Sequence, residues 1–177
     1  HYAISRKEIQ ARWGDVGSGV AFERARKALL KLELQYYHPK NWRPAILALS
    51  GGAWSRYHLA EYAYWLAAGH GILTLGQIIP DAGDRRIERR RQAEKRLRSF
   101  IHEENLGAFP VVVLEKSLET GIQSLLESHG IGGMRPNTVL MGLPKNREKW
   151  EDFCQALRVA DAYERSILLV DCDEELE

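Results

Sequence analysis

The stretch that decides the fold is Gly130-Ile-Gly-Gly-Met-Arg-Pro-Asn-Thr-Val-Leu-Met-Gly-Leu-Pro144, in which a glycine-rich corner leads into a short apolar run. The run from Thr138 to Met141 is too short for a buried helix and is typical of a central strand in a parallel sheet. The glycines at 130, 132 and 133 suit turn conformations that other residues avoid, and Pro136 ends any preceding helix. The stretch therefore predicts a corner that feeds a buried strand, and it carries no chemically reactive group.

Four more apolar runs have the length of strands, and they are Ala45–Leu49, Ile72–Ile79, Phe109–Leu114 and Ser166–Val170. Helical patterns separate the five runs, over residues 55–68, 84–105, 118–128 and 148–163. Strand and helix alternate, and each connection is long enough for a helical crossover. The pattern predicts an α/β fold with a doubly wound, mostly parallel five-stranded sheet and helices on both faces.

The spacing of apolar residues also predicts which helix faces are buried. In helix 55–68 the residues expected to share one inward face are Leu59, Tyr62, Ala63 and Leu66. In helix 84–105 we expect Asp84 to cap the start, and we expect the inward face to carry Ile87, Leu97 and Ile101.

Before the sheet, the sequence predicts two further segments. Residues 1–19 are polar and end in the glycine-rich run 14–19, which resembles a dinucleotide motif but follows no strand, so a linker is predicted. Residues 20–39 are predicted to hold an amphipathic connecting helix, since Phe22, Ala25, Leu29 and Leu32 recur at helical spacing. The α/β domain then occupies residues 40–171, and residues 172–177 form an acidic end.

Composition excludes several classes of protein. The net charge of +1 argues against a surface devoted to nucleic acid, and no apolar run approaches the roughly 18 residues of a membrane span. Cys154 and Cys172 show no CxxC spacing, which favours reduced thiols. The chain opens with His1 rather than Met, so we expect it to be a fragment of a longer protein.

Ligands of such sheets bind at the carboxyl ends of the strands, near the switch point. The candidate binding residues there are Ser50 and Gly51 after the first strand, and Gly142 and Lys145 after the fourth. Backbone N–H groups at Ser50-Gly51-Gly52 could hold a phosphate, although a tight turn explains the same residues. The chain lacks a P-loop and the spaced glycines of a stress-protein nucleotide site, and Lys145 also suits a solvated surface.

No catalytic or metal-binding residues are predicted, because the histidines show no ligand spacing and GxSxG is missing. The helix after the second strand is strongly basic from Arg85 to Arg98. It could be a solvated face, or it could contact an anionic partner such as lipid head groups or RNA. No aromatic strand motif supports RNA, so nucleic acid is not an expected partner.

Three ordered segments resemble the cytosolic C-terminal domain of the cation-chloride cotransporter family, most closely the potassium-chloride branch and its prokaryotic relatives. They are Trp13-Gly14 with the helix that follows, Lys40-Asn41-Trp42-Arg43-Pro44, and Gly130–Pro144. A weaker fourth match is Phe109–Leu114 with Gly121-Ile122. Together these matches span most of residues 12–170.

The resemblance implies a non-enzymatic regulatory and dimerisation domain with a universal-stress-like fold, held at the cytoplasmic face of the cell membrane. Residues 1–19 would then lead from the protein's own transmembrane domain, and the parent would carry out cation-coupled cotransport of chloride or amino acids. Relatives that bind adenine nucleotide imply a site around Ser50, Gly51, Gly142 and Lys145. The basic helix Arg85–Arg98 would face the membrane surface or a partner.

Two departures from the family limit what is implied. Phosphorylation-rich insertions are absent, so kinase regulation is not implied, and residue 177 falls where relatives continue into a second subdomain. The alternative interpretation is a stand-alone nucleotide-binding domain of the stress-protein type. A third, an α/β hydrolase or transferase, lacks a nucleophile and a base.

Overall fold

The computed structural model describes residues 16–34, 39–51, 56–81 and 84–171. The chain divides into two compact units, residues 1–36 and 37–177, and each is described by itself. The predicted acidic end at residues 172–177 and most of the predicted linker lie outside the described residues.

The first unit contains helix α1, Val16–Leu34. The helix begins four residues before the predicted start at residue 20, and it includes Gly17 and Gly19. Glu23 anchors the early turns through contacts of 2.8 Å with Arg26 and 3.5 Å with Lys27. Such i,i+3 and i,i+4 pairs support a helix locally, although they are weaker than the helix propensity that the two glycines cost.

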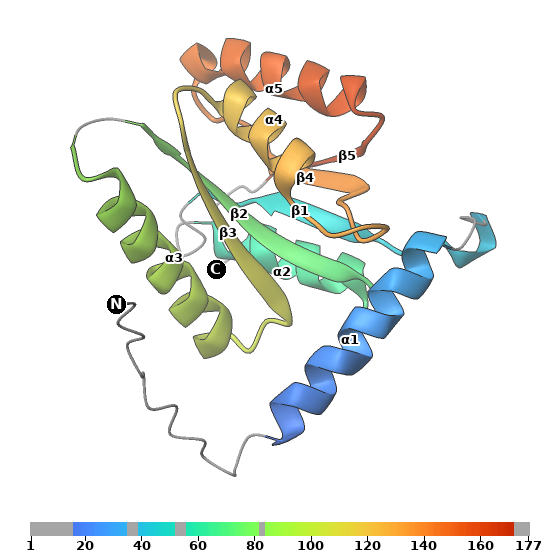
Figure 1. Cartoon of the computed structure of the whole chain (residues 1–177). Coiled ribbons are helices and arrows are strands. Elements are labelled where there is room, and N and C mark those ends of the chain that lie inside the picture. The colour runs from blue at the N-terminus through green and yellow to red at the C-terminus, as the bar shows by residue number, and fades with distance from the viewer. Residues whose placement is uncertain (1–15, 35–38, 52–55, 82–83, 172–177) are drawn as a thin grey trace, which may run out of the picture. The chain divides into compact units, whose positions relative to one another are not determined.

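The second unit alternates strands and helices as predicted (Figure 1). Its strands are β1 (Ala45–Leu49), β2 (Ile72–Pro80), β3 (Ala108–Glu115), β4 (Thr138–Gly142) and β5 (Ser166–Val170). Its α-helices are α2 (Tyr57–Ala67), α3 (Arg86–Glu103), α4 (Leu118–Ser128) and α5 (Trp150–Ala162), with 3-10 turns at Pro39–Asn41 and Arg147–Lys149. Each α-helix and strand bound of this unit lies within two residues of the predicted bound.

The five strands form one sheet in the order β3-β2-β1-β4-β5, and every pairing is parallel. The chain moves outward from β1 to β3 and then returns to the other side of β1 as β4. The doubly wound topology is therefore confirmed, and its switch point lies between β1 and β4.

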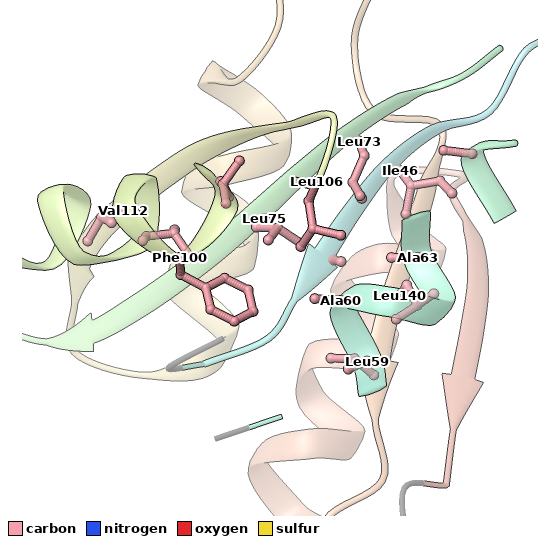
Figure 2. Close-up of a cluster of buried hydrophobic side chains, with 14 residues drawn as sticks. Ile46, Leu59, Ala60, Ala63, Leu73, Leu75, Phe100, Leu106, Val112 and Leu140 are labelled. Carbon is pink, nitrogen blue, oxygen red and sulfur yellow. The ribbon is translucent and has the colours of Figure 1, made fainter. Parts of the chain in front are cut away.

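The core has two layers, one on each face of the sheet. Helices α2 and α3 cover one face, where Leu59, Ala63 and Phe100 pack against Leu75 and Leu140 (Figure 2). Helices α4 and α5 cover the other face, against the strand residues Leu47, Leu49, Val139 and Met141 (Figure 1). Alternate residues of β1 and β4 thus enter opposite layers, which explains why both strands are continuously apolar.

The corner before β4 has the predicted backbone. Gly130 has φ of 101°, and a Cβ there would lie 2.7 Å from the carbonyl oxygen of Met134. Only glycine fits such a site without a backbone shift. Gly132 also has a positive φ of 56°, whereas Gly133 does not lie in that region.

Several predicted details of α3 and α2 are wrong. Arg85, not Asp84, precedes α3, and no side chain caps the helix there. Ile87 is 69% exposed, because the buried residues of α3 lie in its C-terminal half and an open cleft of about 830 Å³ separates its start from β3. In α2 the small residues Ala60, Ala63 and Ala67 face the sheet, so Tyr62 and Leu66 remain exposed on a flank.

This correction can be tested on α3 itself. We expect Leu97→Ala to lower the free energy of unfolding by about 2–5 kcal/mol, since Leu97 is fully buried. The matched change Ile87→Ala should shift it by less than about 0.5 kcal/mol. Urea denaturation of both variants measures the difference, and equal losses would contradict the placement of Ile87.

Candidate functional site

Three of the four predicted site residues meet at the switch point. Ser50, Gly51 and Gly142 line one cavity of about 330 Å³ at the carboxyl ends of β1 and β4. The remaining lining is Leu49, Arg56, Gly76, Ile78, Leu118, Met141 and Phe153. Lys145 is not among the lining residues, because the chain leaves β4 through Leu143 and Pro144 before reaching it.

The backbone at the end of β1 forms one wall of this cavity. Ser50 follows the last strand residue and is fully buried, and Gly51 turns the chain with a φ of 64°. A side chain at Gly51 would be strained in that conformation. The predicted turn at Ser50-Gly51 is therefore present.

The hydroxyl of Ser50 has an unusual environment. Its Oγ is buried, and within the described part of the chain nothing hydrogen-bonds to it. A buried polar atom without a partner costs roughly 1–3 kcal/mol, so such atoms are rare in folded proteins. Ser50 is thus the polar group of this cavity whose bonding capacity remains unused.

Arg56 is a residue that the sequence interpretation missed. It lines the cavity from the start of α2, and its Nη1 would lie 3.2 Å from a Cβ built on Gly142. The guanidinium therefore lies beside the end of β4, where Gly142 leaves room for it. A basic residue at the start of the helix that follows a strand-end turn was the available sequence signal.

The lining chemistry favours binding rather than catalysis. Most of the wall is apolar, and its polar groups are one guanidinium, one hydroxyl and backbone atoms. Among the described lining residues there is no carboxylate or histidine to act as an acid or base. Among the described residues no three His, Cys, Asp or Glu side chains cluster to hold a metal.

The basic helix α3 presents a second charged surface. Two of its guanidinium groups have carboxylate partners at short range, Arg86 with Asp81 at 2.7 Å and Arg98 with Glu94 at 3.0 Å. Between Arg85 and Arg98 there are eight basic residues and two acidic ones, a local excess of six positive charges. Most of these basic side chains are exposed.

His129 lies at the opposite end of the sheet and has a structural role. Its Nε2 lies 3.0 Å from Oγ1 of the buried Thr74 in β2, at the end of α4. Burial lowers the pKa of the His129 imidazole below its ordinary value. The neutral ring thus satisfies Thr74 inside the fold rather than forming part of the cavity at the carboxyl ends.

A family model described as solute carrier family 12 (SLC12) matches residues 56–164, more than half of the chain. The chain belongs to solute carrier family 12, the cation-chloride cotransporters. The matched range runs from the start of α2 past the end of α5, so it includes the corner at Gly130 and the strand that follows. The resemblance read from the sequence is therefore confirmed.

Members of SLC12 are membrane transporters, and transporters are not enzymes. The match covers most of the α/β unit, including the carboxyl ends of β2 and β4. It begins after Ser50. In the part of the chain that the structure describes, no helix has the length and apolarity to cross a bilayer.

Because the Ser50 hydroxyl has no hydrogen-bond partner among the described residues, its removal should stabilise the fold rather than destabilise it. We expect Ser50→Ala to raise the free energy of unfolding by about 1 kcal/mol, because it removes a buried group that lacks a partner. The matched change Ser124→Ala should lower it, since Ser124 Oγ donates to Glu115 Oε1 at 2.6 Å. Thermal denaturation of both variants distinguishes the two cases, and a loss for Ser50→Ala would contradict the unpartnered state.

Proposed function

We propose that this chain is the non-enzymatic, cytosolic regulatory and dimerisation domain of an SLC12 transporter. The observation that carries the proposal is that the family match falls on the α/β unit itself, from α2 to α5. An open parallel sheet leaves backbone groups unpaired at its edges, and such edges do not occur in the hydrocarbon core of a bilayer. A domain of this fold therefore lies in the aqueous phase beside the membrane part of its parent.

In this proposal the parent moves ions while the domain adjusts its activity from the cytoplasmic face of the membrane. Helix α1 belongs to a separate compact unit, which fits a connecting role between the α/β domain and the protein's own transmembrane domain. The parent would be a symporter that couples a cation to chloride or to an amino acid. A dimer of the domain would hold two transport units together.

The basic surface of α3 supports a position near the membrane. Each Lys or Arg close to an anionic leaflet contributes about 1 kcal/mol of attraction. A local excess of six positive charges on one helix can therefore orient the domain toward the membrane surface. Electrostatic attraction of this kind needs no specific pocket.

Light scattering of the purified chain tests the dimerisation role. We expect a mass of twice 20.2 kDa at high protein concentration, falling toward the monomer mass on dilution. A monomer at every concentration would contradict a dimerisation role for this chain.

Regulation is tested by flux through the complete transporter. We expect Leu97→Ala, which destabilises the domain, to change ion flux at equal amounts of protein in the membrane. Ile87→Ala on the same helix should leave flux unchanged. Equal flux in both variants and in the unmodified protein would contradict a regulatory role.

The cavity at the switch point supports a second candidate function, binding of an adenine nucleotide. Its volume of about 330 Å³ lies at the lower end of the range for small-molecule sites. Arg56 supplies a cation for a phosphate group and the apolar wall a surface for a base, whereas the Ser50 hydroxyl is fully buried. This is also the site expected of a stand-alone stress-type nucleotide domain.

Calorimetry with ATP and ADP tests the second function. We expect binding with a dissociation constant in the millimolar range or below. Arg56→Ala should weaken that affinity at least about tenfold, since a charge-assisted bond to phosphate is lost. The control Arg98→Ala, which removes a cation outside the cavity, should bind as the unmodified chain does. No heat at millimolar nucleotide would exclude this function.

A further inference from the structure

Helix α2 exposes several large apolar side chains on its solvent side. Its small residues Ala60 and Ala63 point into the buried cluster of Figure 2, so the larger residues of the helix lie outward and on its flanks. Trp65 is 59% exposed, and its ring meets the ring of Tyr62 edge to face at 5.5 Å. Exposed apolar surface of this kind marks an interaction site. The exposed large apolar residues of the helix are Tyr57, Tyr62, Tyr64, Trp65 and Leu66.

Helix α3 covers the same face of the sheet and is basic on its solvent side. Leu97 is fully buried against the sheet. Arg91, Lys95 and Arg98 are exposed and recur four and three residues apart, which sets them together on the side of the helix away from the sheet. Arg98 pairs with Glu94 at 3.0 Å. Within the described residues neither Arg91 nor Lys95 forms an ion pair, so both are available to an anionic partner.

A groove of about 470 Å³ lies along the flank of α3 that is nearer to α2. Its most buried lining residue is Phe100, whose ring meets Tyr57 of α2 edge to face at 6.3 Å. Hydrogen-bond donors with a local excess of positive charge suit a phosphate group, and the groove has that chemistry. Its other described lining residues are two cations, an amide, a hydroxyl and one carboxylate, namely Lys95, Arg96, Gln92, Ser99 and Glu103.

The two layers of helices differ in charge and in exposed apolar surface. Helix α3 carries seven Lys and Arg residues against three acidic ones, and α2 carries one acidic residue, which leaves three positive charges in excess. Helices α4 and α5 carry five acidic residues against Arg158, an excess of four negative charges. Among the described residues of α4 and α5, Trp150 is the one large apolar residue that is exposed. The α2–α3 layer thus combines cations with several exposed aromatic rings, and the α4–α5 layer does not.

We propose that the α2–α3 surface, meaning the exposed apolar residues of α2 and the outward cations of α3, docks on an anionic lipid bilayer. This inference rests on the proposed position beside the membrane and names the face that contacts the lipid. Trp65 and Tyr62 lie among the headgroups, where amphipathic rings are favoured. Arg91 and Lys95 contact lipid phosphates, and the groove beside Arg96 receives one headgroup.

Rings and cations act together at such a surface. Attachment of an interfacial helix scales with the apolar area that it buries plus its electrostatic attraction to anionic lipids, so the two contributions add. Insertion remains shallow, because the buried sides of both helices hold them against the sheet. The same leaflet repels the negatively charged α4–α5 layer, which faces away from it. The charge difference between the layers therefore fixes the orientation of the domain.

Sedimentation of the full chain with lipid vesicles tests the cations. We expect binding to vesicles of phosphatidylcholine mixed with phosphatidylglycerol, with weaker binding at high salt and at least about tenfold weaker binding to phosphatidylcholine alone. Arg91→Glu combined with Lys95→Glu should lower the affinity for the mixed vesicles at least about tenfold.

The matched control for this charge reversal lies on the α5 side of the domain. Arg147→Glu combined with Arg158→Glu changes the net charge equally at exposed positions. This pair should lose less than about threefold in affinity, since salt screens charges on the layer away from the leaflet. Equal losses in both pairs would overturn the inference, because the attraction would then depend on net charge alone.

Substitution of exposed tryptophans tests the apolar contribution. Trp65→Ser should lower the affinity for the mixed vesicles about tenfold, whereas Trp150→Ser on α5 should leave it unchanged. The two rings are matched, because they are 59% and 42% exposed and each meets one neighbouring ring edge to face. The blue shift of tryptophan fluorescence on vesicle binding should shrink in Trp65→Ser and persist in Trp150→Ser. Circular dichroism confirms that each variant remains folded.

Three outcomes would overturn docking on lipid. A chain that binds no anionic vesicle would leave a protein partner as the occupant of the surface, while the light-scattering and flux tests of dimerisation and regulation stand apart. Unchanged vesicle binding in Trp65→Ser would remove the role of the rings. We expect Trp65→Ser to keep the oligomer mass of the unmodified chain, and a fall from a dimer to 20.2 kDa would assign the surface to a second copy.

Discussion

The sheet depends on one amide side chain, that of Asn137 at the start of β4. Its Oδ1 accepts from the backbone N–H of Ala45 at 3.0 Å, and its Nδ2 donates to the carbonyl of Arg43 at 2.7 Å. The Asn137 backbone donates to the carbonyl of Ala45 and accepts from Ser166. One residue thus sets the starting register of β1, β4 and β5, three strands that are far apart in the sequence. Non-local strand pairing has a high entropic cost, so a shared anchor of this kind is an effective constraint.

The position of the cavity follows from that register. Because β1 and β4 begin together, their carboxyl ends also align, and Ser50 and Gly142 line the same cavity. Because β5 begins at the same level, Ile167 and Leu169 present their backbone at the free edge.

Much of the fold could be predicted from the sequence because the strands are apolar runs of strand length bounded by turn residues. The run Thr138–Met141 and the corner at Gly130 are such a case, and so is the helix 118–128. Local spacing could not place Ile87 or Leu66, because burial there depends on how closely each helix approaches the sheet. Ala60 and Ala63 bring α2 close and leave its larger residues on the flank.

The site was predictable in part for the same reason. Ser50, Gly51 and Gly142 lie at the ends of strands, so topology alone brings them together. Lys145 lies three residues beyond the end of β4 and does not line the cavity. Arg56 was missed because its place in the cavity depends on Gly142, at the far end of another element. No pattern within a short window of sequence carries that information.

Denaturant unfolding of Asn137→Ala tests the dependence of the sheet on this amide most directly. We expect a loss of about 2–4 kcal/mol in the free energy of unfolding, because backbone groups of Ala45 and Arg43 lose their partners. The control Asn146→Ala changes an exposed residue whose side chain makes no capping bond to the following 3-10 turn, and it should lose less than about 0.5 kcal/mol. A loss for Asn137→Ala no larger than that of the control would contradict the role assigned to Asn137.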